Sequence, residues 1–230
     1  MAKLTYFAVQ PMNYIAHYFF DHVPGQPYYN LGLLLPDMLG SFSRRLRPHP
    51  GLPWPVKEMH ERPLKEGILQ HHRADHLFHN SRFFTEGNGF IKTALTTNGL
   101  VKPGVRMFFV THILLELVLD RHLLNTERDV GIRFYDDLAR ISCERTEDFL
   151  LQTGLPAAGF GDHIRRFTEA RYLQSYVKDD GLFYALNRML KATRQNFFEE
   201  DSLEMFSLAL ADIEKYIEDN FELLYKEMKG

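Results

Sequence analysis

The sequence predicts an all-α protein, a single-domain bundle of about seven to nine helices that spans residues 1–230. Apolar residues recur three and four positions apart along most of the chain, and no segment shows the alternating pattern of a strand. Prolines and glycines gather between these periodic segments rather than within them. With 230 residues, 45% of them hydrophobic, the chain is long enough to bury one sizeable core.

The first part of the chain predicts short helices and one long loop. Helices are expected over 14–22, where Asn13 can cap the start, and over 29–39. Residues 40–61 are expected to form a loop, because their prolines forbid a regular helix. A further helix is expected to begin at Pro63, since proline suits the first helical turn.

The second part of the chain predicts longer helices. Residues 86–89, Glu-Gly-Asn-Gly, are expected to break the chain. Residues 105–124 are apolar on nearly every side, which is typical of a central, buried helix. Long amphipathic helices are expected to follow, the last three of which (161–228) complete the bundle: 126–152, 161–177, 181–198 and 202–228.

Composition and charge exclude several classes of protein. A net charge of −3 gives no basic footprint for nucleic-acid binding. The single cysteine, Cys143, excludes an intrachain disulfide and a thiolate metal cluster, so any metal must use nitrogen and oxygen donors. The most apolar stretch contains charged residues and is too short to span a bilayer. The apolar N-terminal run is interrupted by polar residues, so we expect a cytoplasmic protein without a signal peptide.

Histidines and acids at helical spacing form the most informative pattern. His71, Asp75 and His79 are four residues apart, so they stack along one face of a helix. This face continues the apolar stripe that Leu64 and Ile68 begin, which predicts that the ionisable side chains point inward. Burying such groups without partners costs several kcal/mol, so the row requires compensation.

A second pair, His112 and Glu116, repeats this spacing within the buried helix, and His17 and Asp37 lie on other apolar helices. Each pair alone is typical of an internal ion pair. Together they favour one or two divalent cations, Mn²⁺, Fe²⁺ or Zn²⁺ with Mg²⁺ also possible, because such an ion neutralises the acids and uses the neutral imidazoles. The expected ligands are His17, Asp37, His71, Asp75, His79, His112 and Glu116.

Two residues beside this row are candidate catalytic side chains. Arg73, two residues before Asp75, could steady a phosphate, although a surface salt bridge explains it equally well. His72 lies off the inner face and is expected to lie at the surface or to support the site rather than to bind metal.

The motifs resemble those of the acyl carrier protein phosphodiesterases, a family related to the HD-domain phosphohydrolases. Residues 13–17 (Asn-Tyr-Ile-Ala-His) are similar to the family's N-terminal motif, and 34–38 (Leu-Leu-Pro-Asp-Met) fall at its first aspartate. Residues 67–75 (Gly-Ile-Leu-Gln-His-His-Arg-Ala-Asp) are similar to its Gly-Ile-x-x-His-Arg-Arg-x-Asp signature. The closing segments, 171–176, 186–189 and 221–225, are similar to its last helices.

The resemblance implies hydrolysis of the phosphodiester that joins phosphopantetheine to a serine of holo-acyl carrier protein, by a metal-activated water. It also implies an HD-domain-like bundle and an acidic carrier protein as partner, for which Arg44, Arg45 and Arg47 form a plausible docking patch beside the alternative of a solvated loop. The chain departs from the family at His79, His112 and Glu116, where the family has aspartates, which makes the donor set richer in nitrogen.

Two other functions remain open. The order of the candidate ligands is also similar to that of the zinc phospholipases C and single-strand nucleases, although the N-terminal tryptophan of that group is missing. Such an enzyme would hydrolyse a lipid, a nucleotide or another small molecule. Alternatively, the chain is a non-catalytic helical protein whose histidines and acids form a buried polar network or only bind metal.

Overall fold

In the computed structural model, the described residues are 14–43, 46, 48–101, 106–193 and 198–230, and they contain helices but no strands. This confirms the all-α prediction. The helix count exceeds the predicted seven to nine, because the described residues form eleven α-helices and two short 3₁₀ helices. They are α1 Tyr14–Asp21, α2 Pro27–Gly32, α3 Leu35–Phe42, α4 Glu61–Asn80, α5 Arg82–Thr97, α6 Met107–Thr126, α7 Val130–Ala139, α8 Cys143–Gln152, α9 Phe160–Ala170, η1 Tyr172–Val177, α10 Asp179–Ala192, η2 Glu200–Ser202 and α11 Leu203–Lys229.

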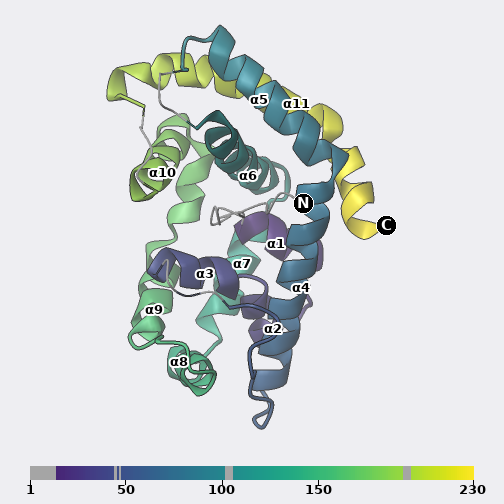
Figure 1. Cartoon of the computed structure of the whole chain (residues 1–230), viewed down its shortest axis with the longest axis vertical. Helices are drawn as coiled ribbons and strands as arrows, with labels where there is room; N and C mark the ends of the chain where they lie inside the picture. The colour runs from purple at the N-terminus through teal and green to yellow at the C-terminus, as the bar shows by residue number, and fades with distance from the viewer. Residues whose placement is uncertain (1–13, 44–45, 47, 102–105, 194–197) are drawn as a thin grey trace, which may run out of the picture.

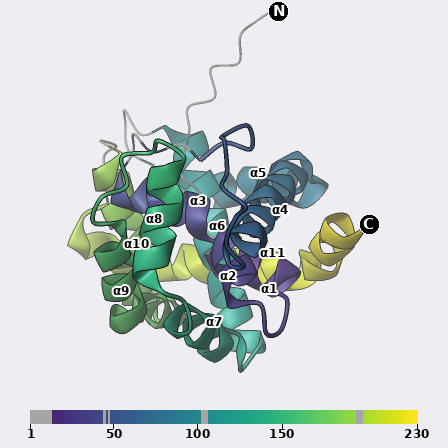
Figure 2. The same ribbon diagram turned by 90° about the horizontal axis from the view of Figure 1, so that it is seen from below.

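Helix α6 is the centre of the bundle, as its apolar sequence predicted. It packs against α1, α5, η1, α10 and α11, and every residue from Val110 to Arg121 is buried. Helices α5 and α11 lie side by side at one end of the long axis, and α2, α3, α8 and α9 lie toward the other (Figure 1). The view from below shows α6 enclosed by the other helices (Figure 2). An ionisable group on α6 is therefore held inside the core.

Helix α4 connects the two ends of the molecule. It runs along one side of the structure, with α2 packed against its first half and α5 and α11 near its end (Figure 1). Its buried face carries Leu64, Ile68, His71 and Phe78. The predicted inward stripe is therefore confirmed at Leu64, Ile68 and His71, whereas Asp75 and His79 are only partly buried. This face brings α4 against α1 and α3.

The segment predicted as one helix over 29–39 is in fact two helices, α2 and α3. Pro36, in the first turn of α3, has no N–H to donate to the carbonyl of Gly32 and its ring would clash there. The helix must therefore restart. Helix α3 then continues to Phe42 and α4 begins at Glu61, so residues 40–42 and 61 of the predicted loop are helical instead.

The predicted break at 86–89 is wrong, because α5 continues through both glycines. Ser81 caps this helix by accepting a hydrogen bond from the Phe84 N–H, and Asn88 donates one back to the Phe84 carbonyl. Gly87 lies against the side chains of Leu115 and Tyr216, where a larger residue would be crowded. Packing against α6 and α11 thus outweighs the low helix propensity of glycine.

Two segments predicted as continuous helices are also divided. Residues 126–152 include α7 and α8, and the second begins at Cys143, directly after Ser142, whose side chain caps it. Residues 161–177 form α9 and η1, which are separated where Arg171 takes a left-handed backbone conformation (φ 46°). The predicted helix over 181–198 is confirmed as α10 up to Ala192, whereas Thr193 and Phe198 are not helical; residues 194–197 and Asn13 lie outside the described residues.

No helix in the described part of the chain combines the length and the apolar character needed to cross a membrane.

Candidate metal centre

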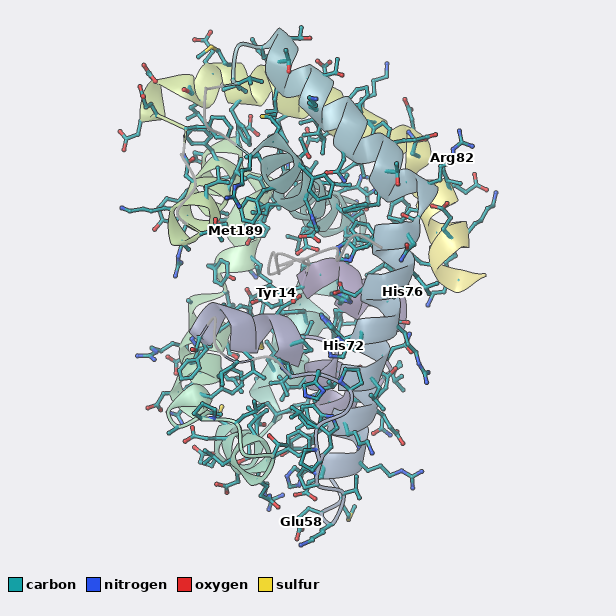
Figure 3. The ribbon with its side chains drawn as sticks, viewed as in Figure 1. Tyr14, Glu58, His72, His76, Arg82 and Met189 are labelled. Carbon is teal, nitrogen blue, oxygen red and sulfur yellow. The ribbon has the colours of Figure 1, made fainter. Side chains whose placement is uncertain are left out.

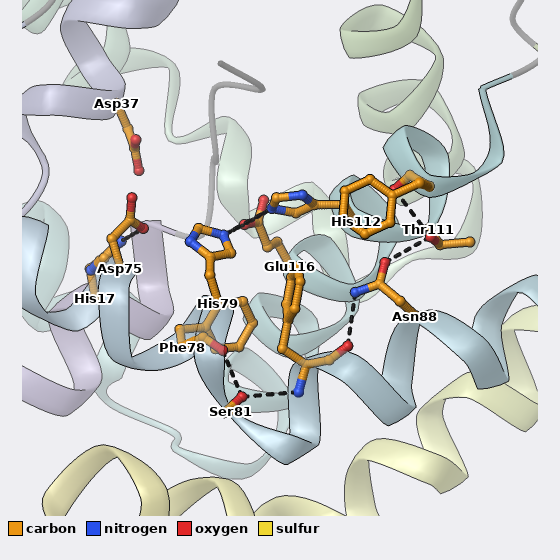
Figure 4. Close-up of polar contacts among 12 residues, drawn as sticks. His17, Asp37, Asp75, Phe78, His79, Ser81, Asn88, Thr111, His112 and Glu116 are labelled. Atoms are coloured by element: carbon orange, nitrogen blue, oxygen red, sulfur yellow. Dashed lines mark hydrogen bonds and ion pairs between the residues drawn. The ribbon is translucent and has the colours of Figure 1, made fainter. Parts of the chain in front are cut away.

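Four helices bring the predicted ligands together in the middle of the molecule. His17 comes from α1, Asp37 from α3, and His112 and Glu116 from α6, while the row 71, 75 and 79 comes from α4. Figure 4 shows six of these side chains, those of His17, Asp37, Asp75, His79, His112 and Glu116, grouped in one region, with the carboxylates of Asp37 and Asp75 directed toward each other. Six of the seven predicted ligands fall into two groups whose donor atoms lie within 4.8 Å of one another, close enough to hold a metal ion.

The first group consists of His17, Asp37 and His71, all of them buried. The rings of His17 and His71 lie 4.1 Å apart between centroids. Nε2 of His71 lies 3.7 Å from Oδ1 of Asp37, and Nε2 of His17 lies 3.5 Å from Oδ1 of Asp75. Asp75 is therefore adjacent to this group, with its side chain 24% exposed.

The orientation of His71 is fixed by the backbone. Its Nδ1 lies 2.8 Å from the carbonyl oxygen of Leu33, which can only accept a hydrogen bond, so Nδ1 carries the proton. The Nε2 lone pair then faces Asp37. Burial and the neighbouring His17 lower the pKa of His71 to about 3, which keeps the imidazole neutral. When Asp37 is ionised, two acceptor atoms face each other here, which is the arrangement that a bound cation would satisfy.

The second group consists of His79, His112 and Glu116. Nε2 of His112 lies 2.9 Å from Oε1 of Glu116 and 3.0 Å from Nε2 of His79. Nε2 of His79 lies 3.5 Å from the same carboxylate oxygen. Three atoms that could each bind a metal ion therefore lie close together, and a single proton cannot bridge all three contacts.

Aromatic rings enclose the second group. The ring of Phe84 contacts both imidazoles edge-on, at 5.0 Å from His79 and 4.9 Å from His112. Nearby, Thr111 donates a hydrogen bond to the side-chain oxygen of Asn88 (Figure 4). These contacts fix α5 against α6, so the two imidazoles are held by packing as well as by their mutual contacts.

The pKa values of Asp37 and Asp75 are shifted in opposite directions. Burial and the nearby carboxylates of Asp75 and Glu116 raise the pKa of Asp37 well above its usual range. Burial also acts to raise the pKa of Asp75, but the neighbouring His17 and His71 outweigh it and the pKa is lowered. Asp37 therefore requires a compensating positive charge to ionise, and a divalent cation would provide it.

One residue that positions the site, Asp120, was not predicted from the sequence. Asp120 is one turn beyond Glu116 on α6 and is fully buried. Its carboxylate accepts hydrogen bonds from the backbone N–H groups of Ile15 and Ala16, at 3.2 and 2.8 Å. It thereby holds the first turn of α1 and with it His17. The spacing 112, 116, 120 on one face of α6 is the sequence signal for this role.

The two candidate catalytic side chains lie outside the cluster. Arg73 is exposed and follows His71 by two positions, which places it on nearly the opposite side of α4. His72 donates a hydrogen bond through Nε2 to the carbonyl of Pro48, 2.7 Å away, so it ties α4 to the loop before it. Figure 3 shows His72 and His76 on successive turns of α4. Arg73 therefore points away from the cluster, whereas His72 borders it through an edge-on contact with the ring of His71, 5.4 Å between centroids.

The predicted docking patch, Arg44, Arg45 and Arg47, lies outside the described residues. Comparisons with protein-family models, with curated proteins and with solved structures found no match. The support for a function therefore comes from the geometry of the metal centre and from the sequence motifs.

Proposed function

We propose that this protein is a metal-dependent phosphodiesterase that hydrolyses the bond between phosphopantetheine and a serine of holo-acyl carrier protein. The observation that carries the metal-dependent part is the contact between His71 and Asp37. There, the unprotonated nitrogen of a neutral imidazole lies 3.7 Å from a carboxyl oxygen in the core, beyond hydrogen-bond distance.

The donor set fits a divalent cation. Several buried polar atoms of the cluster have no hydrogen-bond partner among the described residues: Nε2 of His17, Oδ2 of Asp37, Oδ1 of Asp75, Nδ1 of His112 and Oε2 of Glu116. Unpaired buried atoms are costly, and the cost disappears when they bind or support a cation. Imidazole and carboxylate donors suit Mn²⁺, Fe²⁺ or Zn²⁺.

In this proposal, His17, Asp37 and His71 hold one ion, and His79, His112 and Glu116 hold a second, with Asp75 beside the first. A bound divalent ion would supply an acidified water and positive charge for the phosphate oxygens. The protein's own contribution is to orient the donors. Leu33 fixes the tautomer of His71, and Asp120 anchors the helix that carries His17.

The carrier-protein substrate rests on the sequence resemblance. Residues 67–75 match the family signature at Gly67, Ile68, His71, Arg73 and Asp75. Of these, His71 belongs to the first group of candidate ligands and Asp75 lies beside it. Acyl carrier proteins are acidic, so the basic segment around Arg44 remains the proposed docking patch.

Metal content tests the first half of the proposal. The purified full-length protein is expected to contain Mn, Fe or Zn by elemental analysis, or to bind added Mn²⁺ or Zn²⁺ with an increase in melting temperature. A protein without bound metal, and without stabilisation by either ion, would exclude the metal-dependent hydrolase.

Mass spectrometry tests the second half. Incubation of the metal-loaded protein with holo-acyl carrier protein is expected to remove the mass of phosphopantetheine from the carrier. The matched control is carrier protein incubated with the Asp37→Asn variant. If small phosphodiesters are hydrolysed and the carrier is not, the carrier-protein assignment fails.

A second candidate is a phosphodiesterase of the zinc phospholipase C and nuclease type. The observation in its favour is the nitrogen-rich donor set, which includes four histidines: His17, His71, His79 and His112. Hydrolysis of a phospholipid or a short oligonucleotide in the presence of Zn²⁺, but not of holo-carrier protein, would favour this candidate.

A further inference from the structure

A cavity of about 440 Å³ lies beside the metal centre, between α3, α6, α9, η1 and α10. Its inner wall is formed by buried, mostly apolar side chains, which include Ile113, Phe167, Tyr176, Ala185 and Met189. Exposed residues, among them Ser41, Tyr184 and Arg188, line the side that is open to solvent. Its volume lies within the range of sites that bind small organic molecules, about 300–1,000 Å³.

The cavity adjoins the metal centre but uses different side chains. On α3, Ser41 is one turn beyond Asp37, and on α6, Ile113 is one turn before Glu116. The faces of α3 and α6 that carry metal-centre residues therefore continue into the cavity wall. None of the predicted metal ligands lines the cavity.

The cavity lining carries positive but no negative side-chain charge among the described residues. Arg188 is the one permanently charged side chain among the described lining residues, which include no carboxylate. It forms no ion pair with any residue in the described part of the chain. A guanidinium at the open side of an apolar cavity attracts an anionic group.

His163 does not supply a second positive charge. Ser41 donates its hydroxyl hydrogen to the carbonyl of Met38, so it accepts a hydrogen bond from Nε2 of His163, 2.9 Å away. Burial and the nearby Arg166 and Arg188 lower the pKa of His163. This histidine is thus a neutral clasp between α3 and α9, and Arg188 remains the candidate anion partner.

One polar group of the buried lining has incomplete hydrogen bonding. Tyr176 lines the cavity and is fully buried, and its hydroxyl interacts with the side chain of Tyr172 but forms no hydrogen bond of good geometry with any described residue. An unsatisfied buried hydroxyl is costly, and a ligand atom within the cavity would satisfy it.

We propose that this cavity binds a small amphipathic anion, with its apolar body between the aromatic rings and its anionic group at Arg188. This goes beyond the proposed hydrolase function, because the ligand binds to the cavity whether or not metal is present. An aliphatic chain and an aromatic ring system share this chemistry, and two probes distinguish them.

Calorimetric titration of the full-length protein tests the proposal. Dodecanoate below its micelle concentration and 2-naphthalenesulfonate are the two anionic probes, and dodecan-1-ol is the neutral match of the first. At least one anionic probe is expected to bind with a stoichiometry of one. Arg188→Gln is expected to weaken that binding by about tenfold or more, because a charged hydrogen bond is lost.

Two further variants complete the test. Lys191→Gln removes an exposed positive charge of the same helix that does not line the cavity, and it is expected to leave binding unchanged. Ala185→Phe fills the cavity and is expected to abolish binding; if it does not fold, Arg188→Gln with its control decides the question. The proposal is overturned if neither anion binds, if dodecan-1-ol binds as tightly as dodecanoate, or if Arg188→Gln binds like the wild type. None of these outcomes depends on metal content or hydrolysis.

Discussion

Gly67 of α4 lies directly against Gly32 of α2. A Cβ atom added at Gly67 would lie 2.8 Å from the Cα of Gly32 and 2.1 Å from the carbonyl oxygen of Tyr29. These obstacles are backbone atoms, which cannot rotate away. The glycine of the 67–75 motif is thus explained by the close approach of two helix backbones, one turn before His71.

Gly67→Ala is expected to lower the free energy of unfolding by at least about 2 kcal/mol, because the two helices must separate. Gly89→Ala is the matched control: this glycine is exposed within α5 with no atom near its added Cβ, so the substitution is expected to stabilise by about 0.5–1 kcal/mol. Urea denaturation measures both. Equal stabilities of the two variants would contradict the close contact.

His79→Gln is expected to weaken metal binding by at least about tenfold, since it removes one of the three donors that converge near Glu116. His76→Gln, on the exposed side of the same helix, is the control and is expected to bind metal like the wild type. Titration with Mn²⁺ or Zn²⁺ compares them. Equal losses of affinity in both variants would show that the second group is not a metal site.

Asp120→Asn is expected to destabilise the protein by about 1–3 kcal/mol, because a buried backbone N–H of α1 loses its acceptor. Asp136→Asn, an exposed residue of α7, is expected to change stability by less than about 0.5 kcal/mol. Thermal unfolding measures both effects. A further readout is metal affinity, which is expected to fall in Asp120→Asn because His17 is no longer held in place.

Metal binding is expected to stabilise the fold by mass action, by about 2.7 kcal/mol when the free ion exceeds its Kd a hundredfold. Removal of metal with a chelator should therefore lower the melting temperature, and Mn²⁺ or Zn²⁺ should restore it. Asp37→Asn removes a buried metal-ligand oxygen of the first group, so the increase in melting temperature on adding metal is expected to be smaller in this variant. An increase as large as that of the wild type would exclude Asp37 as a ligand.

Acidification is expected to remove the stability that neutral His163 contributes between α3 and α9. Burial, with the charges of Arg166 and Arg188 facing the ring, lowers the pKa of His163 below its ordinary value of about 6.5. The unfolded chain then binds a proton more readily than the folded one, so this stability is present above about pH 6.5 and is lost as the pH falls below it. His163→Gln should reduce the loss of stability between pH 7 and pH 5. An unchanged pH dependence would contradict this role.

The sequence predicted the class of fold and the composition of the site because both depend on local periodicity. A buried helix that is apolar on every side, and ionisable residues four apart on an apolar stripe, already place α6 and the inward face of α4. The position of His17 and Asp37 beside His71 agrees with the prediction that these residues converge.

Helix ends were decided by tertiary contacts. The continuation of α5 through Gly87 depends on packing against Leu115 and Tyr216, which are distant in sequence. The start of α1 depends on the carboxylate of Asp120. The orientation of Arg73 away from the cluster follows from helix geometry, whereas the hydrogen bond of His72 to the Pro48 carbonyl depends on the path of a loop.

By itself, the sequence determined that the protein is helical and which side chains would need compensation in its core, since spacing along a helix fixes which residues share a face. The tertiary structure alone decided how those side chains divide into two groups, which nitrogen of His71 faces Asp37, and where a cavity adjoins them. These features depend on the packing of helices that are far apart in the chain, which no local pattern encodes.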